Sequence, residues 1–221
     1  MHPTGGYNAF WAGITMGAFG IGALIGALFY RIVKNFTGIP TGILIGLILS
    51  AISFFYQANT LTTESDLLSS AYPRFILGIG LMLCFILCTF FAISEIDKTQ
   101  MTSASGLFHF FRSIFSATGT TLIITLWQRR ISHYTQDLGS SITSYSDAST
   151  NIFSTLKESG FSNEEATETI SSLVNSQSAL LALNDCLWSL GWVCTISAAT
   201  LLVFVLYKQF VPLAKRLPRA E

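Results

Sequence analysis

The chain has 221 residues, of which 51% are hydrophobic and only 11% are charged, and its formal net charge is zero. A soluble domain usually carries about a quarter charged residues, so this composition excludes an ordinary water-exposed domain. The zero net charge gives no general attraction to nucleic acid, and no nucleic-acid partner is expected.

Five stretches reach the roughly 20 apolar residues that a bilayer core requires. Four of them, at about residues 7–30, 38–56, 73–93 and 102–127, fall in the segment 1–127, and the last is 179–207. We therefore predict an all-α membrane protein with about five transmembrane helices. The first eight residues carry neither a basic start nor a cleavage site, so no signal peptide is expected.

Basic residues near the helix ends set the expected orientation of the chain. Arg31 and Lys34 lie between the first two spans, and a basic tail, 208–221, follows the last. An even number of crossings separates the two clusters, so both lie on one face of the membrane. We expect that face, with the C-terminus, to be cytoplasmic, which places the polar segment 128–178 on the periplasmic side.

Glycines recur every four residues in the first two spans. Gly22 and Gly26 share one face of the first, and Gly38, Gly42 and Gly46 share one face of the second. In lipid, such stripes let helix backbones approach closely and gain dispersion contacts. We expect them to pack helices together, although a moving interface in a transporter has the same pattern.

The four cysteines, Cys84, Cys88, Cys186 and Cys194, all fall inside expected spans. A cysteine in lipid usually acts as a small apolar packing residue. Cys84 and Cys88 share a helix face, but two thiols without histidine or carboxylate neighbours make a poor metal site, and nothing else in the sequence implies a cofactor.

The fourth span contains a cation, Arg112, inside an otherwise apolar stretch. A charge at the bilayer centre costs about 2.5 kcal/mol or more, so it is kept where it faces protein, water or substrate. At about 100° per residue, one face of this helix is polar or small, and the opposite face is bulky and apolar. The polar face carries Ser105, His109, Arg112, Ser116 and Gly119. We predict that it lines a cavity and that the other face contacts lipid.

The polar segment 128–178 contains signs of helix. Ser162 and Glu165 have the spacing of a capping box, and Ala166, Ile170 and Leu173 then recur at helical spacing, so a short helix is expected to begin after Ser162. A second short helix is expected at 149–158, ending at Gly160. Two interpretations stay open: a solvated spacer, or a docking surface for a partner outside the membrane.

The last span has a polar stripe as well. Asn184, Trp188, Gly191 and Thr195 share a face, and Asp185 lies one residue round from it, near the outer end. An acid within about 10 Å of the boundary can reach water at a rise of about 1.5 Å per residue. Asp185 therefore either extends to solvent or takes part in the gating of ions or substrate.

Several short motifs, taken together, resemble the end of the EmrB/QacA-type drug:proton antiporters, the fourteen-helix branch of the major facilitator superfamily. In chain order they are Pro73-Arg74-Phe75-Ile76-x-Gly78, Ala104-Ser105-Gly106-Leu107-x-x-Phe110-x-Arg112, Gly119-Thr120, Leu126-Trp127-x-x-Arg130 and Asn184-Asp185-x-x-Trp188. The piece from Ala104 to Arg112 is the most specific, and the resemblance covers nearly the whole chain.

The resemblance implies a partial second bundle, the last five helices of a longer transporter in the bacterial inner membrane. The expected function is proton-coupled export of hydrophobic or amphipathic compounds. The implied partners are membrane lipid, such compounds, protons, the missing part of the transporter and a periplasmic adaptor. The implied substrate and proton pathway is formed by Arg112, His109, Ser116, Asn184, Asp185 and Trp188.

His109 departs from the family, which usually has asparagine at this position. It either adds proton sensitivity near neutral pH or serves as a hydrogen-bonding packing residue. Two other functions stay open: a truncated or split half that needs a partner chain, and a non-transporting protein that binds an adaptor. The sequence contains none of the common catalytic motifs, so no enzymatic activity is expected.

Overall fold

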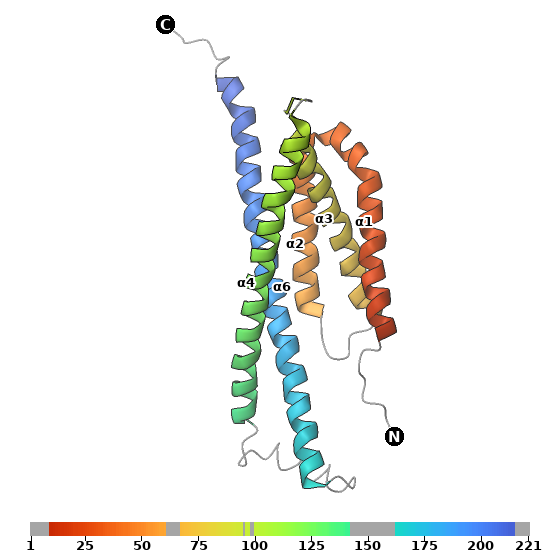
Figure 1. Ribbon diagram of the computed structural model, residues 1–221, viewed down its shortest axis with the longest axis vertical. Coiled ribbons are helices and arrows are strands. Elements are labelled where there is room, and N and C mark those ends of the chain that lie inside the picture. The colour runs from red at the N-terminus through yellow and green to blue at the C-terminus, as the bar shows by residue number, and fades with distance from the viewer. Residues whose placement is uncertain (1–8, 61–66, 95, 98–99, 142–161, 215–221) are drawn as a thin grey trace. The chain divides into compact units, whose positions relative to one another are not determined.

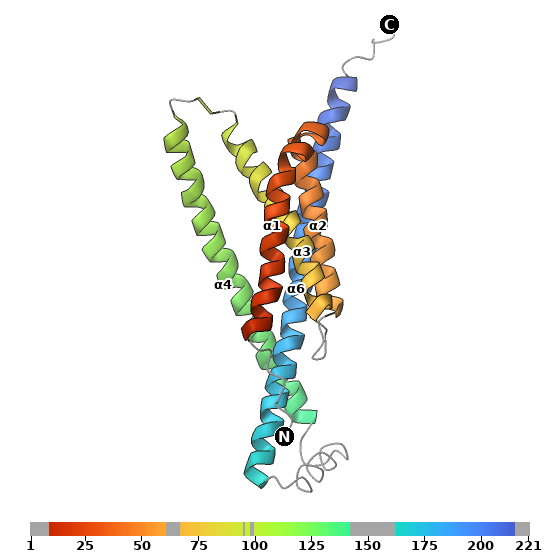
Figure 2. The same cartoon turned by 90° about the vertical axis from the view of Figure 1, so that its right-hand side faces the viewer.

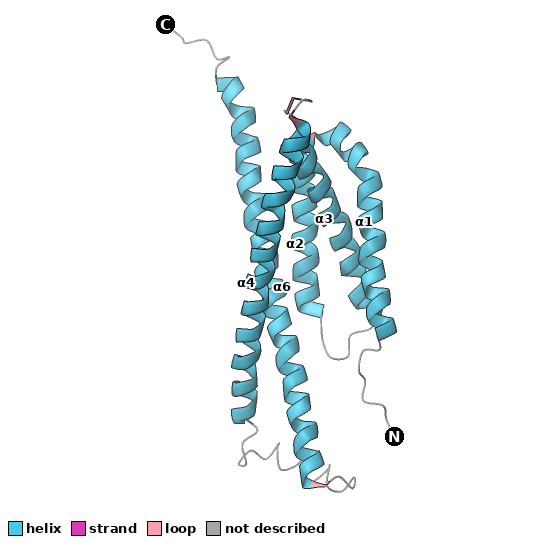
Figure 3. Ribbon diagram, in the orientation of Figure 1, coloured by secondary structure: helices cyan, strands magenta, loops and turns pink. Residues whose placement is uncertain are grey.

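The structure is a computed structural model that describes residues 9–60, 67–94, 96–97, 100–141 and 162–214. Every regular element in these ranges is an α-helix (Figure 3). In chain order the helices are α1 (Ala9–Thr37), α2 (Ile39–Thr60), α3 (Leu67–Ile93), α4 (Met101–Ser141) and α6 (Asn163–Ala214) (Figure 1). All five are long and apolar enough to cross a membrane, which confirms the expected class, a helical membrane protein consistent with a partial bundle.

The chain divides into two compact units, which are described separately. Among the described residues, the first unit contains α1, α2, α3, the part of α4 up to Ser113 and the part of α6 from Leu187. The second unit contains the rest of α4, from Ile114, and the part of α6 up to Cys186.

In the first unit, α3 packs against both α1 and α2 (Figures 1 and 2). Glycines make these contacts close. A Cβ atom at Gly22 would overlap the carbonyl oxygen of Phe75 on α3, and one at Gly46 would lie 2.8 Å from the carbonyl oxygen of Gly80. Gly26 likewise faces the carbonyl oxygen of Ile79, whereas Gly42 faces the side chain of Leu87. The packing interpretation of these four glycines is therefore confirmed.

Gly38 has a different role from the one expected for it. It separates α1 from α2 and has a φ of +82°, a left-handed conformation that glycine adopts without steric penalty. Its amide donates to the carbonyl of Lys34 at 3.1 Å, and its own carbonyl accepts from the amide of Gly42 at 3.0 Å. A Cβ atom here would meet nothing within 4 Å, so Gly38 is a helix-ending residue and not part of the packing stripe.

Buried polar side chains connect α2 with α3. Ser53 donates to the carbonyl of Pro73, which lies inside α3, at 2.5 Å, and Gln57 donates to the Ser53 hydroxyl at 3.2 Å. Such bonds between helices stabilise packing where no water can compete for the polar groups.

Helices α4 and α6 extend into the segment 128–178, which was expected to be a polar loop. Helix α4 runs on to Ser141, and α6 is already helical at Asn163 and continues through the last span. Neither extension contains proline, and a helix that has formed adds residues easily. The expected helix at 149–158 and the final part of the basic tail, 215–221, lie outside the described residues.

The capping box is present at the start of α6. The amide of Ser162 donates to the Glu165 carboxylate at 2.9 Å, and the amide of Glu165 donates to the Ser162 hydroxyl at 3.3 Å. The expected short helix in this region therefore consists of the first turns of α6.

Candidate functional site

Arg112 lies on α4 and stacks on an aromatic ring of α3. Its guanidinium carbon is 4.5 Å from the centroid of the Phe85 ring, within the first unit. Among the described residues, no carboxylate lies within ion-pairing distance of Arg112. A cation–π contact contributes about 0.5–1 kcal/mol at an exposed site. The ring therefore offsets only part of the cost of placing this charge inside a span.

The part of α4 around Arg112 is exposed on both faces. His109, Arg112 and Ser116 on the polar face are exposed, and so are Phe110 and Ile114 on the apolar face. The expected contrast between a cavity-lining face and a lipid-facing one therefore stays a prediction. For the polar face to line a cavity, other helices must cover it.

His109 contacts the aromatic ring of its neighbour Phe108, with ring centroids 5.8 Å apart. Ser116 belongs to the second unit, where its carbonyl accepts a hydrogen bond from the hydroxyl of Thr120 at 2.9 Å. Of these two residues, His109 is the one in the same compact unit as Arg112.

Asp185 forms a polar cluster with α4 in the second unit. Its Oδ2 atom lies 3.4 Å from Nη1 of Arg130 and accepts a hydrogen bond from the Tyr134 hydroxyl at 2.9 Å. The side chain of Asp185 is 30% exposed and that of Arg130 is 49% exposed. Asp185 is thus paired with α4 and partly exposed, and its role in gating stays a prediction.

A third residue of α4, Trp127, also contacts α6. The indole Nε1 of Trp127 donates to the carbonyl of Ala179 on α6 at 3.4 Å. Trp127, Arg130 and Tyr134 are three and four residues apart, so they share one face of α4. This spacing could have indicated the face that meets α6. The sequence interpretation had used Trp127 and Arg130 only as marks of family resemblance.

Trp188 takes part in helix packing in the first unit. Its ring lies edge-on to Phe55 of α2, with centroids 5.0 Å apart, and the ring of Trp192 also lies edge-on to Phe55, at 5.8 Å. Gly191 makes room for this ring, because a Cβ atom there would lie 2.9 Å from Phe55. Three members of the last span thus hold one aromatic side chain of α2.

One polar contact between helices was not anticipated from the sequence. Arg74 of α3 donates to the hydroxyl of Thr15 on α1 at 2.8 Å, and Thr15 is 1% exposed. The feature of the sequence that could have indicated this contact is Arg74 itself, a cation just inside the apolar third span. Such residues usually face a partner and not lipid.

The six expected site residues are divided between the two units. His109, Arg112 and Trp188 belong to the first unit, and Ser116, Asn184 and Asp185 belong to the second. A common wall formed by all six stays a prediction. Within the described part of the chain, no group of three or more His, Cys, Asp or Glu side chains could hold a metal ion.

The fold and these polar groups define a multi-pass membrane protein with charged residues inside its candidate spans. Sequence comparison specifies the class further: over most of its length, the chain is distantly homologous to the EmrB-type multidrug exporters of the major facilitator superfamily. It is 25% identical over 186 residues to the multidrug export protein EmrB of Escherichia coli K12, which covers 83% of this chain.

Two further relatives give the same result. EmrB of Haemophilus influenzae is 26% identical over 188 residues, or 82% of this chain, and the fatty acid resistance protein FarB of Neisseria gonorrhoeae is 23% identical over 182 residues, or 81%. The match covers 36%, 36% and 35% of the three relatives, so the chain spans about a third of their length. No protein-family model matches the sequence, and no solved structure matches it significantly.

Proposed function

We propose that this chain forms part of the second helix bundle of a proton-coupled exporter of hydrophobic or amphipathic compounds. The observation that carries the proposal is the similarity to EmrB proteins over 83% of the chain. The names of the relatives, multidrug export and fatty acid resistance, both point to compounds that partition into membranes.

In carriers built from two bundles, the substrate site lies near the bilayer midplane, between the bundles. Arg112 is eleven residues after Met101, the first residue of α4, which is roughly 16 Å along the helix at about 1.5 Å per residue. This depth suits a cavity residue. The guanidinium would hydrogen-bond across the cavity or pair with an acid from the opposing bundle, with His109 and Ser116 on the same wall.

Transport by alternating access requires a second bundle that moves against the first. The chain spans about a third of its relatives' length, which favours a part that acts with other helices, in the same or in a separate polypeptide. The exposed faces of α4 around Arg112 would then contact those helices. In the orientation set by Lys34, the C-terminal end of α6 would lie in the cytoplasm of a bacterium and the chain would reside in the inner membrane.

The test is dye export in a bacterial strain that lacks its own multidrug exporters. Two forms are expressed: the chain alone, and the longest reading frame that contains it. We expect the longer form to lower the accumulation of an amphipathic fluorescent dye, and a protonophore to abolish the effect. We expect no export from the chain alone. A longer form that is inserted but exports none of a panel of dyes would contradict the proposal.

A further inference from the structure

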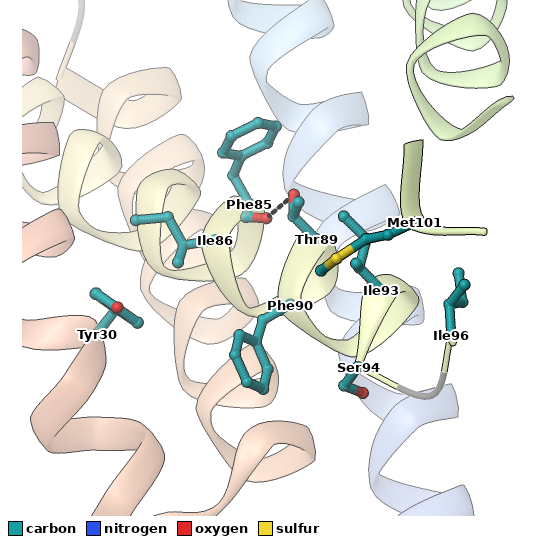
Figure 4. A pocket seen from close by; sticks show the side chains of 9 residues that line it. All are labelled: Tyr30, Phe85, Ile86, Thr89, Phe90, Ile93, Ser94, Ile96 and Met101. Atoms are coloured by element: carbon teal, nitrogen blue, oxygen red, sulfur yellow. Dashed lines mark hydrogen bonds between the residues drawn. The ribbon is translucent and has the colours of Figure 1, made fainter. Parts of the chain in front are cut away.

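A pocket of about 570 Å³ lies in the first unit, near the ends of α1 and α3 and the start of α4 (Figure 4). This volume is within the range of small-molecule sites, about 300–1,000 Å³. The lining is mostly apolar and comes from Tyr30, Phe85, Ile86, Thr89, Phe90, Ile93, Ser94, Ile96 and Met101. In Figure 4, Phe85 and Phe90 lie on the same stretch of α3, and their rings point to opposite sides of the helix.

Each of the two pocket phenylalanines carries a cation on its ring. The Nζ atom of Lys34 lies 3.4 Å from the centroid of Phe90, and the guanidinium of Arg112 lies 4.5 Å from that of Phe85. In the part of the chain that the structure describes, neither cation has a carboxylate within 4.0 Å. Arg31, three residues before Lys34 and exposed, adds positive charge on the same side of α1.

The pocket begins at the end of a span and runs inward. Its lining includes Ile93, the last residue of α3, and reaches back to Phe85, eight residues or roughly 12 Å along the helix. Lys34 is likewise in the last turn of α1. The Lys34 side is therefore at the level of lipid headgroups, and the Phe85 side is at the level of acyl chains.

We propose that this pocket binds an anionic phospholipid. One acyl chain lies along Phe85, Ile86 and Met101, and the phosphate lies at Lys34, with Arg31 nearby. A transported compound would be held near the midplane, whereas this pocket opens at the helix ends. Basic residues next to apolar pockets between helices recognise anionic headgroups in this way. In the orientation given above, the lipid would belong to the cytoplasmic leaflet, and only this assignment rests on the proposed function.

The experiment measures lipid retention by native mass spectrometry of the purified full chain in detergent. The probes are phosphatidylglycerol and phosphatidylcholine with identical acyl chains, and free oleate as a separate anionic amphiphile. We expect phosphatidylglycerol to be retained over phosphatidylcholine. Lys34→Gln should weaken its binding about fivefold, and Lys34→Arg should restore it. No transport assay is involved, so the result is independent of export.

Arg129→Gln is the matched control, because Arg129 is an exposed cation on α4 that does not line the pocket. It should leave phosphatidylglycerol binding unchanged. Equal retention of the two phospholipids, or an equal loss in the Lys34→Gln and Arg129→Gln variants, would overturn the proposal. Oleate that displaces phosphatidylglycerol at equal concentration would assign the pocket to fatty acids instead. Circular dichroism of each variant confirms that helix content is retained.

Discussion

The carboxylate of Asp185 on α6 lies 3.4 Å from the guanidinium of Arg130 on α4. This acid of α6 is thus paired with a cation from α4, and the Tyr134 hydroxyl donates a further hydrogen bond to it at 2.9 Å. The indole N–H of Trp127 also donates to the carbonyl of Ala179, so one face of α4 makes both a charged contact and a hydrogen bond to the backbone of α6.

We expect Arg130→Gln to destabilise the contact between α4 and α6 modestly. The two side chains are 49% and 30% exposed, so solvent screens the pair and its contribution should be below about 1 kcal/mol. The measurement is a double-mutant cycle with Asp185→Asn, read as the thermal midpoint in detergent. Arg129→Gln removes a nearby charge as the control. Additive effects of the two substitutions would show that the ion pair contributes nothing.

Arg112→Ala should abolish export by the longest reading frame that contains this chain, with membrane insertion unchanged. The reason is that the guanidinium lies deep in α4, where a cation is kept for a function and not for stability. Arg112→Lys keeps the charge but loses the planar group that stacks on Phe85, so partial export is expected. Dye accumulation and the amount of protein in the membrane are measured together. Wild-type export by the alanine variant would remove Arg112 from the mechanism.

Gly22→Ala should destabilise the packing of α1 on α3. A Cβ atom at Gly22 would overlap the carbonyl of Phe75, so the backbones must separate, at a cost of about 1–3 kcal/mol. Gly17→Ala in the same helix is the matched control, because a Cβ atom there meets nothing within 4 Å. Thermal midpoints of the two variants in one detergent should differ, with Gly22→Ala the lower. Identical midpoints would contradict the close approach.

The start of α6 should lose stability in acid. The amide of Ser162, together with its side chain, holds the pKa of Glu165 below its ordinary value of 4.5. The stabilisation is therefore complete above pH 4.5, and it is lost as the pH falls through the lowered pKa of the folded state. Glu165→Gln should remove this dependence, measured as helix content against pH. Glu168→Gln, which removes the same charge without touching the capping box, should keep it.

Gly38→Ala should destabilise the junction between α1 and α2 by about 1–2 kcal/mol, because an L-residue with a side chain pays that amount in the left-handed region. No steric clash contributes, since the space around Gly38 is open. Asparagine tolerates this conformation better, so Gly38→Asn should have a smaller effect on the thermal midpoint. Equal losses from the two substitutions would point to a cause other than backbone conformation.

The existence of the five helices could be predicted from the sequence, because the length of an apolar stretch is fixed by the thickness of the bilayer. The packing of Gly22 and Gly46 followed from the four-residue spacing in the same way. The role of Gly38 could not be predicted. Its spacing of four residues from Gly42 is the same whether it packs against a helix or ends one. Spacing alone cannot show backbone conformation.

The partners of the polar residues were harder to predict than the helices. The position of Asp185 near the outer end of a span stays a prediction, and nothing in one helix reveals which residue of another helix meets it. Arg130 and Tyr134 lie outside the apolar stretch that ended at Trp127, so their helical face was not considered. For Arg112, the cavity expected on its polar face needs helices beyond the five that the structure describes, and this part of the hypothesis stays a prediction.

Only Gly38 connects α1 with α2, so the two helices cannot move far apart at this end. A rotation or an axial shift of either helix is passed directly to the other, and α3 is wedged against both by backbone contacts at Gly22 and Gly46. We therefore expect these three helices to move together whenever the chain changes conformation.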